Sequence, residues 1–222
     1  MKFTHLHVHS HYSMLDGMSK IGDLVSRCKE LGMNSIALTD HGNMYGIKDL
    51  SDTCKKINGA AKKELEDVKK KLSEETDETK KAELQKKVDE LQVKVDEAKA
   101  NPFKPIFGIE AYCARRHRKL MDKDAKYVDP ESGNLRSIDR SGWHLILLAK
   151  NKKGYQNLCK MSSLAFMEGD YGRPRIDKEL LEEYHEGIIC CSACIGGEIP
   201  QKIFAGKIDE AEEAALWFKH LF

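Results

Sequence analysis

The sequence predicts an α/β fold in which short strands alternate with amphipathic helices. An apolar run at residues 34–39 follows a helical stripe at residues 21–31, and the same alternation returns later in the chain. Histidine and aspartate residues stand just past several of the expected strands. Such alternation favours parallel βα units, whose functional groups collect at the carboxyl ends of the strands.

Composition narrows the class of protein. The 222 residues allow one large domain, or one and a half, and the net charge of +1 gives no global field that would attract nucleic acid or a membrane. The N-terminus lacks the apolar core of a signal peptide, and no run is long enough to span a membrane. Seven scattered cysteines do not form a secreted disulfide framework. We expect a reduced, cytoplasmic protein.

The first residues carry the strongest chemical signal. Residues 3–9 alternate like a strand, so that His5, His7 and His9 would share one face. Asp16 follows in a turn. An isolated histidine is more often an ordinary core or surface residue, but a His-x-His pair with a nearby carboxylate favours a metal site.

The next elements repeat this arrangement. Ser19 suits a helix N-cap before the stripe at residues 21–31, and Gly32 suits the position after its end. The strand at residues 34–39 leads directly into Asp40 and His41. The motif could be an ordinary turn, but its place beside His9 and Asp16 makes His41 a further metal ligand candidate.

A charged segment interrupts the fold. Apolar residues recur every three or four positions over residues 47–72, and the pattern returns over residues 84–98 after a polar break. Two such stripes suggest an antiparallel helical hairpin, although a single solvated helix is the simpler alternative. We assign residues 58–100 to an insertion, with residues 1–57 and 101–222 forming the main body. The charges alone do not support a docking role.

The second half contributes three further strands. The strand at residues 104–112 contains Glu110, whose burial would be costly without a partner or a cation. His144 begins a strand at residues 143–149, and Cys194 follows a strand at residues 187–192. The Cys-x-x-Cys spacing that ends at Cys194 is by itself weak evidence for redox or zinc chemistry. A loop at 114–142 with a basic run, a helix at 155–166 and a loop at 171–177 separate these strands. A helix at 208–222 follows the last of them.

Several segments together resemble the PHP (polymerase and histidinol phosphatase) superfamily. These are His7-x-His9, Asp16-Gly17, Thr39-Asp40-His41, Gly108-x-Glu110 and the segment from His144 to Ala149. The amino-acid sequence is similar to one branch of this superfamily, the N-terminal PHP domains of bacterial DNA polymerase III alpha subunits. The similar segments are residues 6–17, 38–46, 147–158, 174–177 and 192–198. The resemblance covers the chain apart from the insertion.

The resemblance implies a distorted seven-stranded βα (TIM-like) barrel that holds up to three divalent ions through nine ligands. Zinc or manganese is favoured, with magnesium and iron as alternatives. The matching ligands here are His7, His9, Asp16, His41, Glu110, His144 and Cys194. Cys194 stands where relatives often have histidine. The last family ligands, an Asp-x-His pair, have no counterpart, so we expect a fragment with an incomplete barrel.

The implied chemistry is phosphoester hydrolysis, with Glu110, Asp16 and His41 in catalytic positions. Arg175, Arg115 and Arg116 are the candidates for substrate phosphate contacts. In the polymerase branch the implied activity is 3′–5′ proofreading of DNA in the bacterial replisome. The implied partners are DNA, the rest of the polymerase chain, and replisome subunits such as the clamp or a separate proofreading subunit, with no membrane. The alternatives are a catalytically silent scaffold for the polymerase and, less favoured, a free-standing phosphatase.

Overall fold

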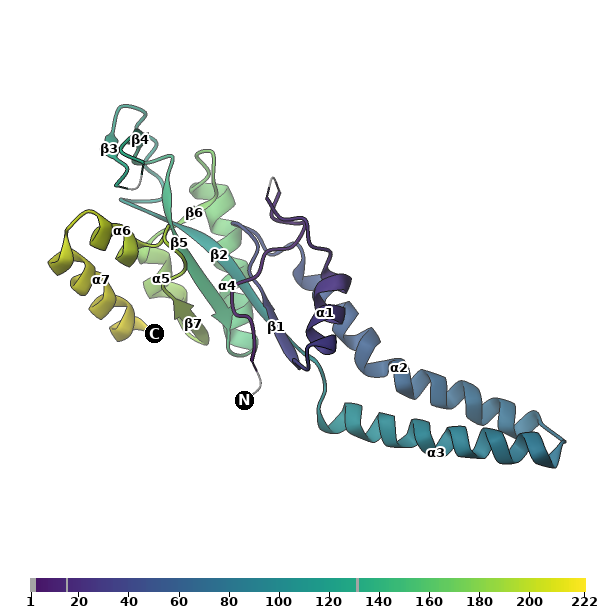
Figure 1. Ribbon diagram of the computed structural model, residues 1–222. Coiled ribbons are helices and arrows are strands. Elements are labelled where there is room, and N and C mark those ends of the chain that lie inside the picture. Colours follow the sequence, from purple (N-terminus) through teal and green to yellow (C-terminus); the bar gives the residue numbers. More distant parts are fainter. Residues whose placement is uncertain (1–2, 15, 131) are drawn as a thin grey trace. The chain divides into compact units, whose positions relative to one another are not determined.

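The computed structural model describes residues 3–14, 16–130 and 132–222 (Figure 1). The chain divides into two compact units. Unit 1 contains Ile21–Ile36 and Lys48–Pro105, and unit 2 contains His5–Lys20, Ala37–Ile47 and Ile106–Phe222.

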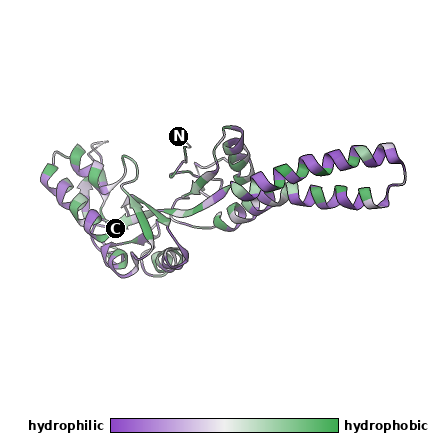
Figure 2. Cartoon of the chain, turned by 90° about the horizontal axis from the view of Figure 1, so that it is seen from below, coloured by the Kyte–Doolittle hydropathy of each residue, from purple (hydrophilic) through white to green (hydrophobic). Residues whose placement is uncertain are grey.

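Unit 1 is dominated by a helical hairpin. Its helices are α1 (Ile21–Glu30), α2 (Ile47–Glu74) and α3 (Glu78–Ala100). Helix α1 ends where Gly32 adopts a φ of +74°, as the sequence predicts. The apolar residues of α2 and α3 pack against each other, and the buried members of this cluster are Leu65, Val68, Val88, Leu91 and Val95. Hydrophilic residues cover most of the hairpin (Figure 2).

Side-chain hydrogen bonds define both ends of the hairpin. At its tip, the Asp77 carboxylate accepts hydrogen bonds from the backbone of Thr79 and Lys80 and caps α3. At its base, the Asn58 amide donates to the Phe103 carbonyl at 3.0 Å and accepts from the Phe103 amide at 2.8 Å. The two chain segments are therefore joined where they enter and leave the hairpin.

A mixed five-stranded sheet carries the rest of the fold. Its main path runs β1 (Ser35–Leu38), β2 (Lys104–Ala114), β5 (Gly142–Ala149) and β7 (Ile188–Cys191), and β6 (Arg175–Ile176) pairs with β2. Strand β5 is antiparallel to both β2 and β7, whereas β6 is parallel to β2. The prediction of uniformly parallel βα units is therefore wrong for the central strands.

The main core lies on one face of this sheet. Alternate residues of β2 and β5, such as Ile109, Ala111 and Leu147, meet apolar residues of α4 (Lys152–Glu168) and α5 (Lys178–Tyr184). Residues of α7 (Ile208–Leu221), including Trp217, pack at the margin of the same cluster, and α6 (Glu198–Phe204) precedes α7. The other face of β2 and β5 carries a smaller apolar cluster that includes Ala37, Ile146 and Leu148, and beside it the polar side chains Glu110 and His144.

Two local expectations need correction. Residues 3–9 do not form a regular strand, although their backbone bonds β1: the Ala37 and Thr39 amides donate to the carbonyls of His5 and Val8, each at 2.9 Å. The loop predicted at 114–142 contains a small hairpin of β3 (Lys126–Val128) and β4 (Leu135–Ser137). The described strands form no closed barrel.

One further property concerns membranes. In the part of the chain that the structure describes, none of the helices combines the length and apolar character of a membrane span.

Candidate metal centre

Glu110 is the centre of a cluster of histidines. It lies in β2, and only 1% of its surface is exposed. One carboxylate oxygen lies 2.6 Å from His144 Nδ1, and the other contacts His41 Nδ1. His7 Nε2 and His9 Nε2 approach the same carboxylate at 3.6 and 3.4 Å. Four imidazoles from three parts of the chain therefore surround one buried carboxylate.

His7 and His9 aim at a common point. Their Nε2 atoms lie 2.9 Å apart, and both face Glu110. Alternation in an extended backbone places residues i and i+2 on one side even where the segment is not a regular strand. His5, which the strand pattern placed on the same face, belongs to neither of the ligand groups described below.

A buried carboxylate holds His9 in this orientation. Asp40 is 1% exposed and accepts hydrogen bonds from Ser10 N at 2.6 Å and from Ser13 Oγ at 2.7 Å. Ser13 Oγ also lies 2.9 Å from His9 Nδ1. Because Nδ1 is occupied, Nε2 is the ring nitrogen left to face Glu110. Partners of this kind fix the orientation of metal-binding histidines.

Asp16 and His41 form the outer part of the cluster. Asp16 Oδ2 lies 2.8 Å from His41 Nε2 and is largely exposed. The turn after Asp16 needs glycine, because a Cβ on Gly17 would lie 1.9 Å from the Ser10 carbonyl oxygen. Gly42, with a φ of +64°, donates its amide to the Glu110 carbonyl at 2.8 Å and holds His41 beside β2.

The antiparallel strand β5 brings in His144. Tyr112 pairs with His144 and Glu110 pairs with Ile146, so Glu110 and His144 project from the same face of the sheet. A residue near the start of β5 therefore lies beside the carboxyl half of β2. Cys194, in the turn after β7, places Sγ 3.7 Å from His144 Nδ1, while the His144 amide donates to the Gly196 carbonyl.

Electrostatics favour an ionised Glu110. Burial opposes its ionisation, but hydrogen bonds and charge from His144 and His41 outweigh that effect and lower the pKa of Glu110. The hydrogen bond to Glu110 raises the pKa of His41, with a further contribution from Asp16. Desolvation and the neighbouring His41 lower the pKa of His9, which favours the neutral, ligand-competent imidazole.

The arrangement fits divalent metal. Two groups, His7–His9–Glu110 and Glu110–His144–Cys194, each offer ligand atoms that lie within 4.8 Å of one another. Metal–ligand bonds of about 2.0–2.3 Å need only small side-chain adjustments from such spacing. His41 Nδ1 and Glu110 Oε2 are buried against each other, and neither atom has a further hydrogen-bond partner among the described residues. Mixed nitrogen, oxygen and sulfur donors suit borderline ions such as zinc.

A third cluster of similar residue types has a different character. His117, Asp177 and Glu179 also approach one another, but Arg118 Nη1 donates to Asp177 at 2.9 Å and to Glu179 at 3.0 Å. The charge of these carboxylates is therefore neutralised within the protein. This cluster is a structural ion-pair network.

The three arginines predicted to contact phosphate have different surroundings. Arg175 is 0% exposed, and its guanidinium donates to the carbonyls of Gly169, Asp139, Arg118 and Leu120, an environment that does not favour the expected substrate contact. Arg116 pairs with the buried Asp139 and does not line the pocket beside the cluster. Arg115 does line that pocket and bonds Ser141 and Tyr127.

Known proteins resemble this chain across its whole length. The PHP domain family model matches residues 5–222, and the chain belongs to this family. It is 39% identical over 221 residues to the DNA polymerase III subunit alpha of Borreliella burgdorferi. It is 36% identical over 231 and 225 residues to the corresponding subunits of Campylobacter jejuni and Treponema pallidum. Each match covers 100% of this chain and 14% of the relative, in its N-terminal part. The sequence resemblance is thereby confirmed.

Sequence reasoning missed two features of the site. Ser13 and Asp40 orient His9, and the sequence pattern around these two residues predicts no such role. Arg173 lines the pocket, whereas its neighbour Arg175 is buried. Both arginines flank Pro174, and nothing in their local pattern shows which of them faces the pocket.

Proposed function

We propose that this chain is a metal-dependent phosphoesterase that removes nucleotides from DNA 3′ ends within a DNA polymerase. The observation that carries the proposal is Glu110, a buried carboxylate shared by two groups of side chains that could hold a metal ion beside an open pocket. Membership of the PHP family and the similarity to polymerase subunits support the choice of DNA as substrate. The closed seven-stranded barrel remains a prediction from the family.

Each residue of the centre would have a definite task. Glu110 would join the two groups, and His7, His9, His144 and Cys194 would complete them. Asp16 would orient His41 through its contact with Nε2 at 2.8 Å. When bound, divalent cations activate water at neutral pH and neutralise the charge that builds up on a phosphodiester. The sheet holds Glu110 and His144 rigidly, which keeps the ligands preorganised.

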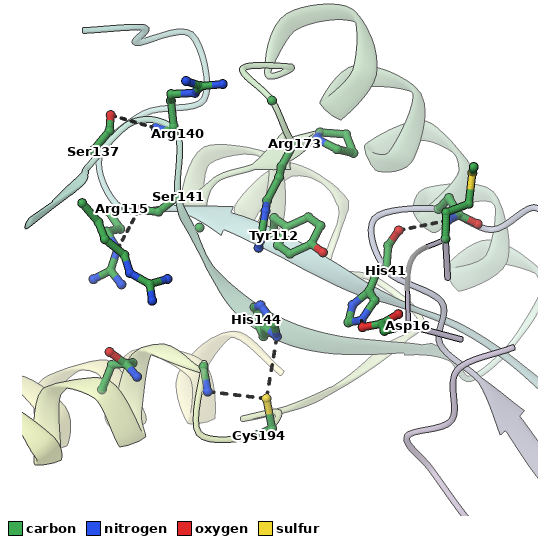
Figure 3. Close-up of a pocket in the computed structure, with 18 of the residues that line it drawn as sticks. Asp16, His41, Tyr112, Arg115, Ser137, Arg140, Ser141, His144, Arg173 and Cys194 are labelled. Carbon is green, nitrogen blue, oxygen red and sulfur yellow. Dashed lines mark hydrogen bonds and ion pairs between the residues drawn. The ribbon is translucent and has the colours of Figure 1, made fainter. Parts of the chain in front are cut away.

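The pocket would admit the substrate. Its volume is about 1180 Å³, and Asp16, His41, His144 and Cys194 line it together with arginine and aromatic side chains (Figure 3). The ligand side of the site is acidic and imidazole-rich, so the phosphate to be cleaved would contact these ligands only with cations present. Arg115 remains a candidate phosphate contact at this pocket.

Release of nucleotides from a labelled single-stranded DNA tests the proposal. The full chain should shorten the strand from its 3′ end in the presence of zinc or manganese and in the absence of deoxynucleoside triphosphates. A chelator should abolish the reaction, and added metal should restore it. A protein that binds zinc or manganese but leaves the strand intact would contradict hydrolysis and favour the scaffold role, in which the PHP domain supports the polymerase and a separate proofreading subunit.

Cellular context follows from the same proposal. A domain of a replicative polymerase would act in the bacterial cytoplasm, with the remainder of the polymerase chain and the clamp as partners. Residues 58–100 would then be an insertion that is separate from the catalytic body.

A further inference from the structure

The pocket beside the metal centre has a second wall that is basic and aromatic. Arg115 and Arg140 lie across the pocket from Asp16 and His41, and Arg173 extends between them beside Tyr112 (Figure 3). The arginines that line it are Arg115, Arg136, Arg140 and Arg173. Among the described lining residues outside the metal centre, the acidic one is Asp129. This wall therefore carries excess positive charge close to a site for anion chemistry.

Two of these arginines already have hydrogen-bond or ion-pair partners within the protein. Arg115 donates to Ser141 Oγ at 3.1 Å and to Tyr127 OH at 2.9 Å, and Arg136 pairs with Asp129 at 3.0 Å. Arg140 and Arg173 are exposed residues, and their guanidinium groups contact the Tyr171 and Tyr112 rings but make no hydrogen bond or ion pair to any residue that the structure describes. Their donors are available to an anionic ligand.

Arg173 lies next to the metal centre. Its guanidinium carbon is 4.7 Å from the centroid of the Tyr112 ring, and that ring lies 5.3 Å from the His144 ring and 6.2 Å from the His41 ring. Figure 3 shows Arg173 extending past Tyr112 toward His144. A planar guanidinium in this position can hold a phosphate by two parallel hydrogen bonds.

The turn that presents Arg173 is fixed at its base. Asp170 and Pro174 form an antiparallel bridge, and the buried Arg175 side chain donates to the Gly169 carbonyl at 2.9 Å. Arg140 packs against the same turn, with its guanidinium carbon 5.5 Å from the Tyr171 ring. The two free arginines are therefore neighbours along one wall, with Arg173 beside the metal centre.

An exposed aromatic pair lines the same pocket. The rings of Tyr45 and Phe166 are stacked at 6.4 Å with an interplanar angle of 27°. They are 64% and 41% exposed, although burial of aromatic side chains is normally favourable. Exposed aromatic rings beside free arginines are the combination that binds single-stranded nucleic acid, because unpaired bases stack on the rings and phosphates pair with the cations.

We propose that Arg173 and Arg140 hold successive phosphates of a single-stranded DNA 3′ end and that Tyr45 and Phe166 stack against its bases. This inference rests on the proposed function, since it specifies the substrate of the same site. It assigns the specificity for an unpaired strand to this wall. Duplex DNA would not bind this wall in the same way, because paired bases cannot stack on the exposed rings.

Binding of a fluorescent oligothymidylate to the full 222-residue chain tests the inference, with anisotropy measured in a chelator so that no cleavage occurs. Arg173→Ala and Arg140→Ala should each weaken binding about fivefold at about 0.1 M salt and lower the salt slope by about 0.7. Tyr45→Ala and Phe166→Ala should each weaken it about tenfold with the slope unchanged. Arg173→Lys, which keeps the charge, should retain the wild-type slope.

Arg27→Ala is the matched control, since it removes one exposed arginine from α1, outside the pocket. It should leave both the affinity and the slope unchanged. Wild-type slopes for both Arg173→Ala and Arg140→Ala would overturn the inference, and so would equally tight binding of thymidine monophosphate or of a duplex. If the variants change affinity and salt slope as expected but no metal-dependent cleavage occurs, the proposed hydrolysis is contradicted and the proposed binding of single-stranded DNA is supported. If cleavage occurs without the pattern, the inference alone fails.

Discussion

Glu110→Gln should weaken binding of zinc or manganese about 100-fold while the chain stays folded. Glu110 belongs to both ligand groups, so the substitution removes the charge that they share. A unit charge about 4 Å from a divalent cation contributes about 8 kcal/mol at an effective dielectric constant of about 20. Desolvation of the buried carboxylate offsets several kcal/mol of this. A net loss of about 3 kcal/mol corresponds to the expected 100-fold change.

Competition titration against a chromogenic chelator measures this change. Glu198→Gln is the matched control, because Glu198 is also buried, at 4% exposure, but pairs with Lys178 and Lys202 outside both ligand groups. It should leave metal affinity unchanged. Equal metal affinity in Glu110→Gln and the wild type, with both chains folded, would refute the assignment of Glu110 as the shared ligand.

The pairing of Glu110 with His41 also gives the metal-free chain a pH dependence. The raised pKa of His41 means that its contribution to stability is complete below about pH 6.5 and is lost as the pH rises through its folded value. The lowered pKa of Glu110 means that its contribution is present above about pH 4.3 and is lost as the pH falls. The pair should therefore stabilise the fold most between these values.

Chemical unfolding at a series of pH values checks this window. Wild-type stability should decline above about pH 6.5, and the decline should be smaller in Glu110→Gln, which lacks the partner that raises the His41 pKa. Identical pH profiles in the two chains would contradict the pairing.

Three further changes give separate tests. Ser13→Ala should lower metal affinity about 10- to 100-fold in the same titration, because His9 loses its orienting partner; an unchanged affinity would show that Ser13 has no such role. Replacement of residues 59–100 by a short glycine-containing loop should leave metal affinity unchanged, since the hairpin packs on itself, and loss of folded protein would contradict this. Arg175→Lys should reduce the free energy of unfolding by about 3 kcal/mol, because lysine cannot bond the same carbonyls, and a change below about 1 kcal/mol would oppose the anchoring role.

Local sequence patterns were sufficient for much of the fold. The stripe of α1 and the glycine that follows it, the paired stripes of α2 and α3, and the apolar strand that contains Glu110 all depend on neighbours within a few residues. The direction of β5 cannot be predicted from such local neighbours, because an apolar run has the same pattern whether the strand pairs parallel or antiparallel. That direction decides where His144 lies. His144 stands near the start of its strand, whereas parallel βα units place functional groups at strand ends, and the antiparallel pairing with β2 explains why it reaches the site.

In the candidate site, too, some features follow from local sequence and others depend on tertiary packing. His7 and His9 could be placed together from sequence, since alternation needs only an extended backbone, and the structure brings their Nε2 atoms within 2.9 Å. The choice between Arg173 and Arg175 could not be made, because burial is set by the segments around Gly169 and Asp139 that enclose Arg175. The role of the seven side chains as metal ligands stays a prediction.

The distribution of the ligands along the chain links metal binding to folding. His7 and His9 are local neighbours and could hold an ion in an unfolded segment. Glu110, His144 and Cys194 come together only through the sheet, and the last two are 50 residues apart in sequence. A metal that binds the folded state more tightly than the unfolded one stabilises the fold in proportion to the logarithm of its concentration. Glu110 connects the local pair to the distant pair, so the stabilisation by metal should depend on this residue more than on either histidine of the local motif.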